Sequence, residues 1–189
     1  MRRLIALVIL LAHPAQAQDW NDYEQILAQN ADRMTQETDS AGMLVRKLTL
    51  DPQITITCTG PEGAAVCEGR ELAGLIPIGC EMQLLSEISA IMHKCEAFGS
   101  TAERATVATI FERTGTYVAA QTVPAQDWSA LRPLAEAAAD LTVQGQSCDV
   151  YMDPDGSWLV LLRAVVNAET QERLRKSLLV PRLPVASRC

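Results

Sequence analysis

Six cysteines constrain the fold of this 189-residue chain more than any other feature of its sequence. Their number is even, and in an exported chain an even set favours a framework of disulfides over free thiols or metal ligands. Four of them fall in the stretch from Cys58 to Cys95, and two lie far downstream. The predicted disulfide residues are Cys58, Cys67, Cys80, Cys95, Cys148 and Cys189.

The spacing of these cysteines limits how they pair. Cys58 and Cys67 flank the turn sequence of residues 59–63, so a hairpin would bring them together in a ring whose closure is worth about 2.7 kcal/mol. An apolar stripe predicts a helix over residues 81–96. Cys80 and Cys95 would then be roughly 22 Å apart along its axis and could not pair with each other. Two arrangements remain open, 80–148 with 95–189 or 80–189 with 95–148.

The first residues have the pattern of a secretory signal. Arg2 and Arg3 precede the apolar run 4–12, and Ala15-Gln16-Ala17 is an A-x-A cleavage site before Gln18. The alternatives are an uncleaved anchor or a buried helix, but nine apolar residues are far fewer than the roughly 20 of a spanning helix. We therefore predict a signal peptide at 1–17, a single disulfide-stabilised domain at 18–189, and a periplasmic or secreted location without a transmembrane anchor.

The charge balance argues against nucleic acid as a partner. The chain has 23 acidic and 16 basic side chains, and cleavage of the signal removes two of the arginines. Neutralising phosphates requires a basic face, which so acidic a chain does not supply in bulk. Acids concentrate in residues 18–43 and basic residues in 160–189. We expect these two ends to lie near each other, the alternative being a basic patch for an acidic partner.

Periodicity and turn signals predict an α+β fold, a mostly antiparallel sheet with helices packed on one face and stapled by disulfides. Besides the helix at 81–96, helices are predicted at 19–38, 128–141 and 168–178, the last capped by Asn167. Strands are predicted at 43–50, 53–58, 64–69, 146–152 and 157–166, with the last two joined by the turn 153–156. The tail from Val180 should be extended.

Residues 101–123 allow two interpretations. Ser100 and Glu103 match a capping box, and an apolar stripe would continue a helix. However, strand-forming residues surround Arg113-Thr114-Gly115, a plausible hairpin loop. We favour a short helical turn followed by a hairpin.

The sequence contains no recognisable catalytic, cofactor-binding or metal-binding motif. His93 is the only histidine left after cleavage, and it falls opposite the apolar stripe of its helix, where a solvent-facing residue is expected. The chain has no C-x-x-C pair for zinc or thioredoxin-like chemistry, no G-x-S-x-G elbow and no glycine-rich phosphate loop. Asp153 to Gly156 places its glycine too early for an EF-hand loop. Paired carboxylates remain open, because sequence spacing does not reveal spatial pairs.

These observations favour a non-catalytic exported module that binds a protein or an envelope component, as an inhibitor, adaptor or assembly factor would. The alternative is a hydrolase that acts on an envelope polymer through two carboxylates. A thiol-redox role, with Cys189 as the reactive thiol, is a more distant third. No cofactor is predicted, and the sequence does not identify the partner.

Overall fold

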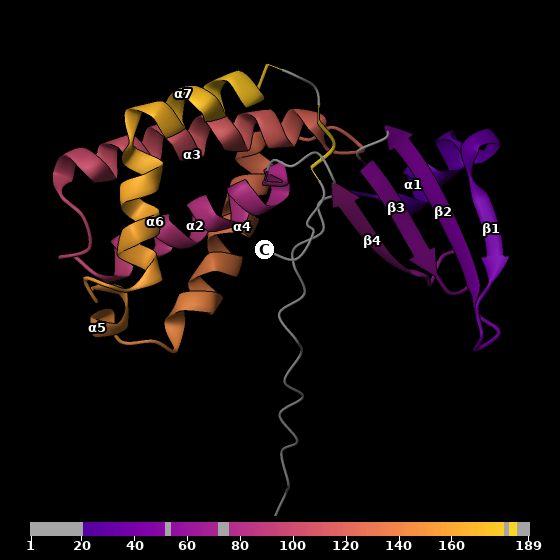
Figure 1. The fold of residues 1–189 in the computed structure, drawn as a ribbon, viewed down its shortest axis with the longest axis horizontal. Coiled ribbons are helices and arrows are strands. Elements are labelled where there is room, and N and C mark those ends of the chain that lie inside the picture. Colours follow the sequence, from indigo (N-terminus) through magenta and orange to yellow (C-terminus); the bar gives the residue numbers. More distant parts are fainter. Residues whose placement is uncertain (1–20, 52–53, 72–75, 180–181, 185–189) are drawn as a thin grey trace, which may run out of the picture.

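The computed structural model describes residues 21–51, 54–71, 76–179 and 182–184. Within them the chain has an α+β fold, as predicted, with a four-stranded antiparallel sheet beside a group of helices (Figure 1). The predicted signal peptide and Cys189 lie outside the described residues. No helix in the described part is both long enough and apolar enough to cross a membrane.

The sheet is a simple meander in the order β1-β2-β3-β4. Its strands are β1 (Thr35–Thr38), β2 (Leu44–Asp51), β3 (Ile54–Thr59) and β4 (Val66–Glu71). The predicted strands at 43–50, 53–58 and 64–69 are thereby confirmed. Cys58 and Cys67 are directly opposite in the β3–β4 register and form the predicted disulfide.

The helix predicted at 19–38 is wrong beyond its first turns. Helix α1 (Tyr23–Gln29) ends at Asn30. The Asn30 side-chain amide donates to the Ile26 carbonyl at 2.9 Å and so provides a donor for a carbonyl in the last turn of the helix. A short 3₁₀ turn, Ala31–Arg33, follows, and then β1 pairs with β2. Pairing with β2 provides hydrogen-bond partners for the backbone of Thr35–Thr38. The threonines at both ends of this strand are β-branched and suit a sheet better than a helix.

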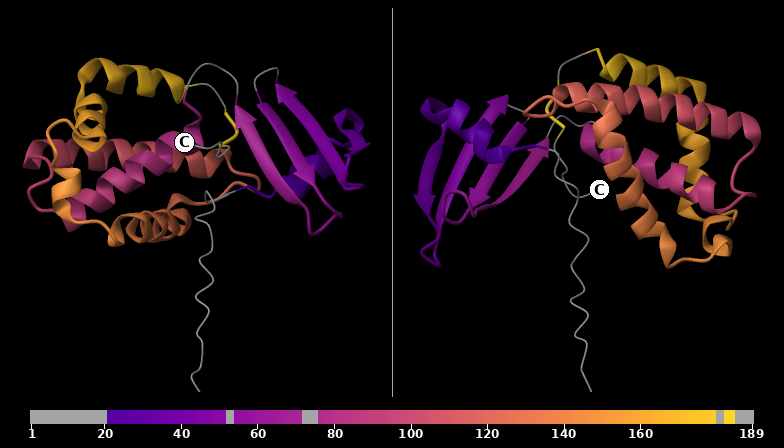
Figure 2. Two further views of the ribbon diagram at one scale, coloured as in Figure 1. Left: turned by 60° about the horizontal axis from the view of Figure 1, so that its bottom comes forward. Right: turned by 180° about the vertical axis from the view of Figure 1, so that it is seen from behind.

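Helix α1 covers one face of the sheet. Its buried side chains pack against alternate residues of the two central strands, forming a cluster of Tyr23, Ile26, Leu27, Leu48, Ile56 and Cys58. The remaining helices pack mainly on one another, with β4 as the strand nearest to them (Figures 1 and 2). They are α2 (Ile78–Lys94), α3 (Thr101–Gln121), α4 (Trp128–Gln144), α5 (Cys148–Tyr151), α6 (Ser157–Val166) and α7 (Ala168–Ser177).

The favoured hairpin within 101–123 is wrong, because Thr101–Gln121 form the continuous helix α3. Ser100 and Glu103 form the complete capping box that the alternative interpretation required. Gly115 lies within the helix, where its missing side chain makes room for the Trp128 ring. This glycine marks a close contact between two helices and not a turn.

The two strands predicted at 146–152 and 157–166 are also wrong, since these residues form α5 and α6. The turn between them does form, with the Gly156 N–H donating to the Asp153 carbonyl at 2.9 Å. A short apolar run such as residues 158–162 has no periodicity that separates a strand from a buried helix. Here packing against other helices decides the outcome: Leu162 is buried among them.

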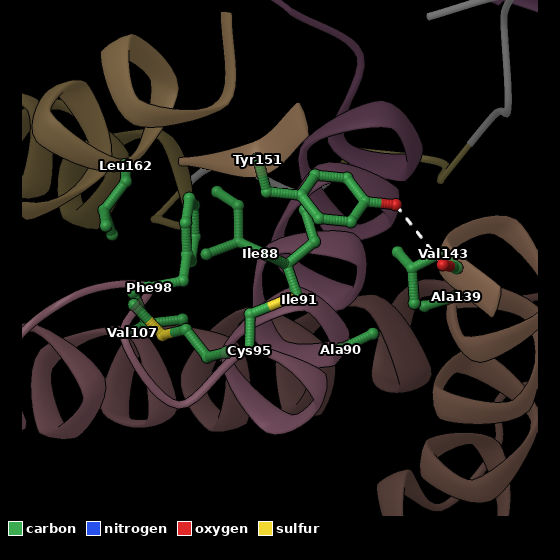
Figure 3. Packing of buried hydrophobic residues seen from close by; sticks show 11 residues of the cluster. Ile88, Ala90, Ile91, Cys95, Phe98, Val107, Ala139, Val143, Tyr151 and Leu162 are labelled. Carbon is green, nitrogen blue, oxygen red and sulfur yellow. Dashed lines mark hydrogen bonds between the residues drawn. The ribbon is translucent and has the colours of Figure 1, made fainter. Parts of the chain in front are cut away.

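That packing forms the core at one end of the helical part. Buried residues from five helices meet there: Ile88, Ile91, Cys95, Val107, Ala139, Val143, Tyr151 and Leu162, together with Phe98 from the α2–α3 loop (Figure 3). The Tyr151 hydroxyl donates to the Val143 carbonyl at 3.4 Å, which ties α5 to the end of α4.

One disulfide and two cations hold this end together. Cys95 is joined to Cys148, which selects the second of the two predicted arrangements. Cys80 is also disulfide-bonded, and its predicted partner, Cys189, lies outside the described residues. The Lys94 ammonium caps α4 by donating to the carbonyls of Val143, Gln144 and Gln146. The Arg104 guanidinium closes the end of α2 by donating to the carbonyls of Met92, Cys95, Glu96 and Phe98.

The acidic and basic ends of the chain meet through residues 182–184, where the Asn21 side chain donates to the Pro184 carbonyl and Leu183 packs against the cluster that includes α1. Figures 1 and 2 nevertheless place the basic helix α7 on the helical side, away from α1 and β1. Glu172 of α7 instead accepts from Arg175 at 2.8 Å and lies 3.5 Å from Lys176. The basic residues of this end are therefore partly balanced within their own helix.

Candidate functional site

An open groove of about 770 Å³ runs between the second half of α3 and the first half of α4. It is lined by Glu112, Thr116, Ala120, Gln126, Asp127, Trp128, Ser129, Arg132, Pro133 and Glu136. Its volume is within the range of small-ligand sites. We take it as the candidate functional site.

The wall of the groove is built around Trp128. The indole N–H donates to the Glu112 carboxylate at 2.8 Å, and the ring meets Phe111 edge-on with a centroid distance of 5.2 Å. A side chain at Gly115 would come within 2.5 Å of the ring, so only glycine allows this approach. These three contacts fix the ring against α3.

A chain of charges crosses the groove beside Trp128. Arg132 donates to the Glu112 carboxylate from one guanidinium nitrogen and to Glu136, one helical turn further on, at 2.8 Å from another. All three side chains are close to half exposed. The two carboxylates, with Glu136 first, raise the pKa of Arg132.

Asp127 adds a further acid at the start of α4. Its carboxylate caps the helix by accepting from the Ser129 backbone N–H at 2.8 Å, and this bond lowers the pKa of Asp127. The groove therefore presents three acids and one arginine on two rigid helices. Such a surface can recognise polar or charged groups without first ordering its own side chains.

This geometry does not suit catalysis by a pair of carboxylates. Glu112 and Glu136 are close enough to share one guanidinium, but Arg132 occupies the space between them. A glycosidase needs that space for the scissile bond and needs one carboxyl group protonated. The described residues contain no group of three His, Cys, Asp or Glu side chains that could hold a metal ion.

The residues singled out from the sequence lie elsewhere. His93 is exposed at the end of α2, as predicted, and does not line the groove. The disulfide between Cys58 and Cys67 links β3 to β4, and the disulfide between Cys95 and Cys148 links the end of α2 to the start of α5. Sequence reasoning missed the groove: Arg132 and Glu136 have the spacing of a helical ion pair, but nothing local indicates that Glu112 joins them from another helix.

Comparisons with known proteins do not assign the site. No protein-family model, curated protein or solved structure matches the chain.

Proposed function

We propose that this chain is an exported, non-catalytic binding module that holds a polar segment of a partner protein or envelope component in the α3–α4 groove. The observation that carries the proposal is the groove itself, with a fixed Trp128 and a preassembled charge chain through Arg132. Arginine is enriched among the residues that contribute most to protein interfaces, and Arg132 is close to half exposed here.

The disulfides support the exported location. Disulfides persist in oxidising compartments such as the periplasm and the extracellular space, and none of the described cysteines is free. A secretory signal at 1–17 would deliver the chain to such a compartment. We therefore place its partner in the cell envelope or outside the cell.

The test is capture from envelope extracts with residues 18–189 as bait. The informative variant is Arg132→Gln, which breaks the charge chain but leaves the fold intact, because half-exposed ion pairs contribute at most about 1 kcal/mol. Arg70→Gln is the matched control, since Arg70 also forms an exposed ion pair, with Glu68, but on the sheet. We expect a captured component that is lost with Arg132→Gln and retained with Arg70→Gln.

Two results would contradict the proposal. The first is that the wild-type protein captures nothing, or captures the same component as strongly with Arg132→Gln as with Arg70→Gln. The second is release of fragments from an envelope polymer that stops when Glu112 and Glu136 are both changed to Gln. That second result would establish the hydrolase alternative.

A further inference from the structure

The sheet and the helices meet at a junction that includes residues 182–184, which lie between them (Figures 1 and 2). Leu183 packs against the apolar cluster of the sheet. The Pro184 carbonyl accepts from the Asn21 side chain at 2.5 Å, and Asn21 in turn accepts from the Val123 N–H at 3.0 Å. This short segment, which we call the strap, therefore contacts both parts of the molecule.

Arg182 fastens the strap through a buried ion pair. Its guanidinium donates to Glu71 at the end of β4 at 2.9 Å, and to the Ile76 carbonyl just before α2 at 2.9 Å. Only 7% of the Arg182 side chain and 4% of the Glu71 side chain are exposed. Breaking such a pair leaves an uncompensated buried charge. The junction therefore depends on the Arg182–Glu71 pair remaining intact.

A second carboxyl group, that of Glu81, faces the same pair from the first turns of α2. The groups that act on it are Arg182 and Glu71, and Tyr117 of α3 faces Arg182 and Glu71 as well. Among the described residues, the cluster thus holds two carboxyl groups against a single guanidinium. Only one of the two can be ionised with its charge balanced.

The hydrogen bonds of this cluster are incomplete. Glu71 Oε2, Glu81 Oε2 and Arg182 Nη1 are buried, and within the described residues none of these atoms has a hydrogen-bond partner. A neutral Glu81 tolerates this arrangement far better than an ionised one, because an unpaired buried charge is much more costly than an unpaired buried polar group. Burial, with a smaller contribution from Glu71, raises the pKa of Glu81 to about 7, although Arg182 acts in the opposite direction.

We propose that Glu71, Glu81 and Arg182 form a pH-responsive lock on the junction, which is tight while Glu81 is protonated and loosens when Glu81 ionises. Ionised Glu81 competes with Glu71 for the guanidinium that fastens the strap. The direction follows from linkage: a carboxyl group that holds its proton more strongly in the folded state stabilises that state at low pH. This stabilisation is lost as the pH rises through about 7. The proposal is independent of what the groove binds.

Hydrogen–deuterium exchange of residues 18–189 with native disulfides tests the lock at pH 5.5 and pH 8.5. After correction for the intrinsic pH dependence, we expect amides in 76–85 and 182–183 to open at least tenfold more at pH 8.5. In Glu81→Gln this pH dependence should disappear. It should persist in Glu96→Gln, the control, which removes an exposed acid just after α2. Equal opening of the wild-type junction at both pH values, or the same pH dependence in Glu81→Gln, would overturn the proposal.

A titration of the wild-type protein keeps the proposal testable if Glu81→Gln does not fold. Carboxyl ¹³C shifts should show Glu81 ionising near pH 7, and Glu71→Gln should move that midpoint to lower pH, because it removes the competing acid. A Glu81 midpoint near 4.5, the ordinary value for glutamate, would refute the lock.

Discussion

Gly115→Ala is the most direct test of how α3 and α4 are packed. In an isolated helix the change would be favourable by about 1 kcal/mol, since alanine has the higher helix propensity. In this protein the added Cβ would lie 2.5–2.6 Å from three carbon atoms of the Trp128 ring. No carbon pair tolerates that distance, so the ring must move.

The cost follows from what holds the ring. Moving it breaks the bond to the Glu112 carboxylate, worth about 1.5–2 kcal/mol, and the edge-on contact with Phe111, worth about 1 kcal/mol. Subtracting the gain in helix propensity leaves a net destabilisation of about 1.5–2 kcal/mol, within the range for overpacked sites. The free energy of unfolding from urea titration, with disulfides intact, measures this directly.

Two comparisons make the prediction refutable. Gly145→Ala at the end of α4 is the control, because its Cβ would meet nothing within 4 Å, and we expect a change of less than about 0.5 kcal/mol. In a Trp128→Leu background the obstacle is absent, so Gly115→Ala should become neutral or stabilising. If Gly115→Ala is as stable as the wild-type protein, or costs the same in both backgrounds, the packing argument is wrong.

Three further predictions concern the helix ends and the long-range disulfide. Arg104→Ala should lower the free energy of unfolding by about 2 kcal/mol, because it leaves several carbonyls at the end of α2 without a hydrogen-bond donor. Arg104→Lys should recover less than half of that loss, since a lysine lacks the forked donors of a guanidinium. Urea titration of both variants checks this. Replacing Cys95 and Cys148 together by alanine should cost about 4 kcal/mol, the entropy of closing a ring with a sequence separation of 53, and a loss below about 1 kcal/mol would contradict the loop-entropy argument. Ser100→Ala should cost about 1 kcal/mol at neutral pH. The capping bonds lower the pKa of Glu103. The wild-type protein should therefore be more stable than Glu103→Ala above about pH 4.5, and this difference in stability should shrink as the pH falls further. Thermal unfolding of both proteins between pH 3 and 7 measures it.

The sequence was sufficient wherever the determining interactions are local. The turn at 59–63 and the alternation of β3 located the hairpin and its Cys58–Cys67 disulfide. The apolar stripe of α2 separated Cys80 from Cys95 and reduced the cysteine pairing to two arrangements. Asn167, which accepts from two backbone N–H groups, marked the start of α7.

The sequence was insufficient where distant segments compete for the same backbone. Residues 157–166 are apolar enough for a buried strand or a buried helix, and only the neighbours of Leu162 decide between them. The glycine of Arg113-Thr114-Gly115 fits a hairpin loop equally well until the Trp128 ring is placed against it. In each case a local signal had two physical explanations.

The candidate sites depend on tertiary structure almost entirely. The groove requires Glu112 of α3 to meet Arg132 of α4, and the junction requires Glu81 of α2 to face the buried pair of Glu71 and Arg182. Charge type and helical spacing are properties of a sequence, because they act over a few residues. Desolvation and the pairing of charges from distant elements exist only after the chain has folded. For this protein the sequence alone therefore determined the hairpin, the start of α7 and the limits on cysteine pairing. The tertiary structure decided which cysteines join, where a groove opens and which charged side chains meet.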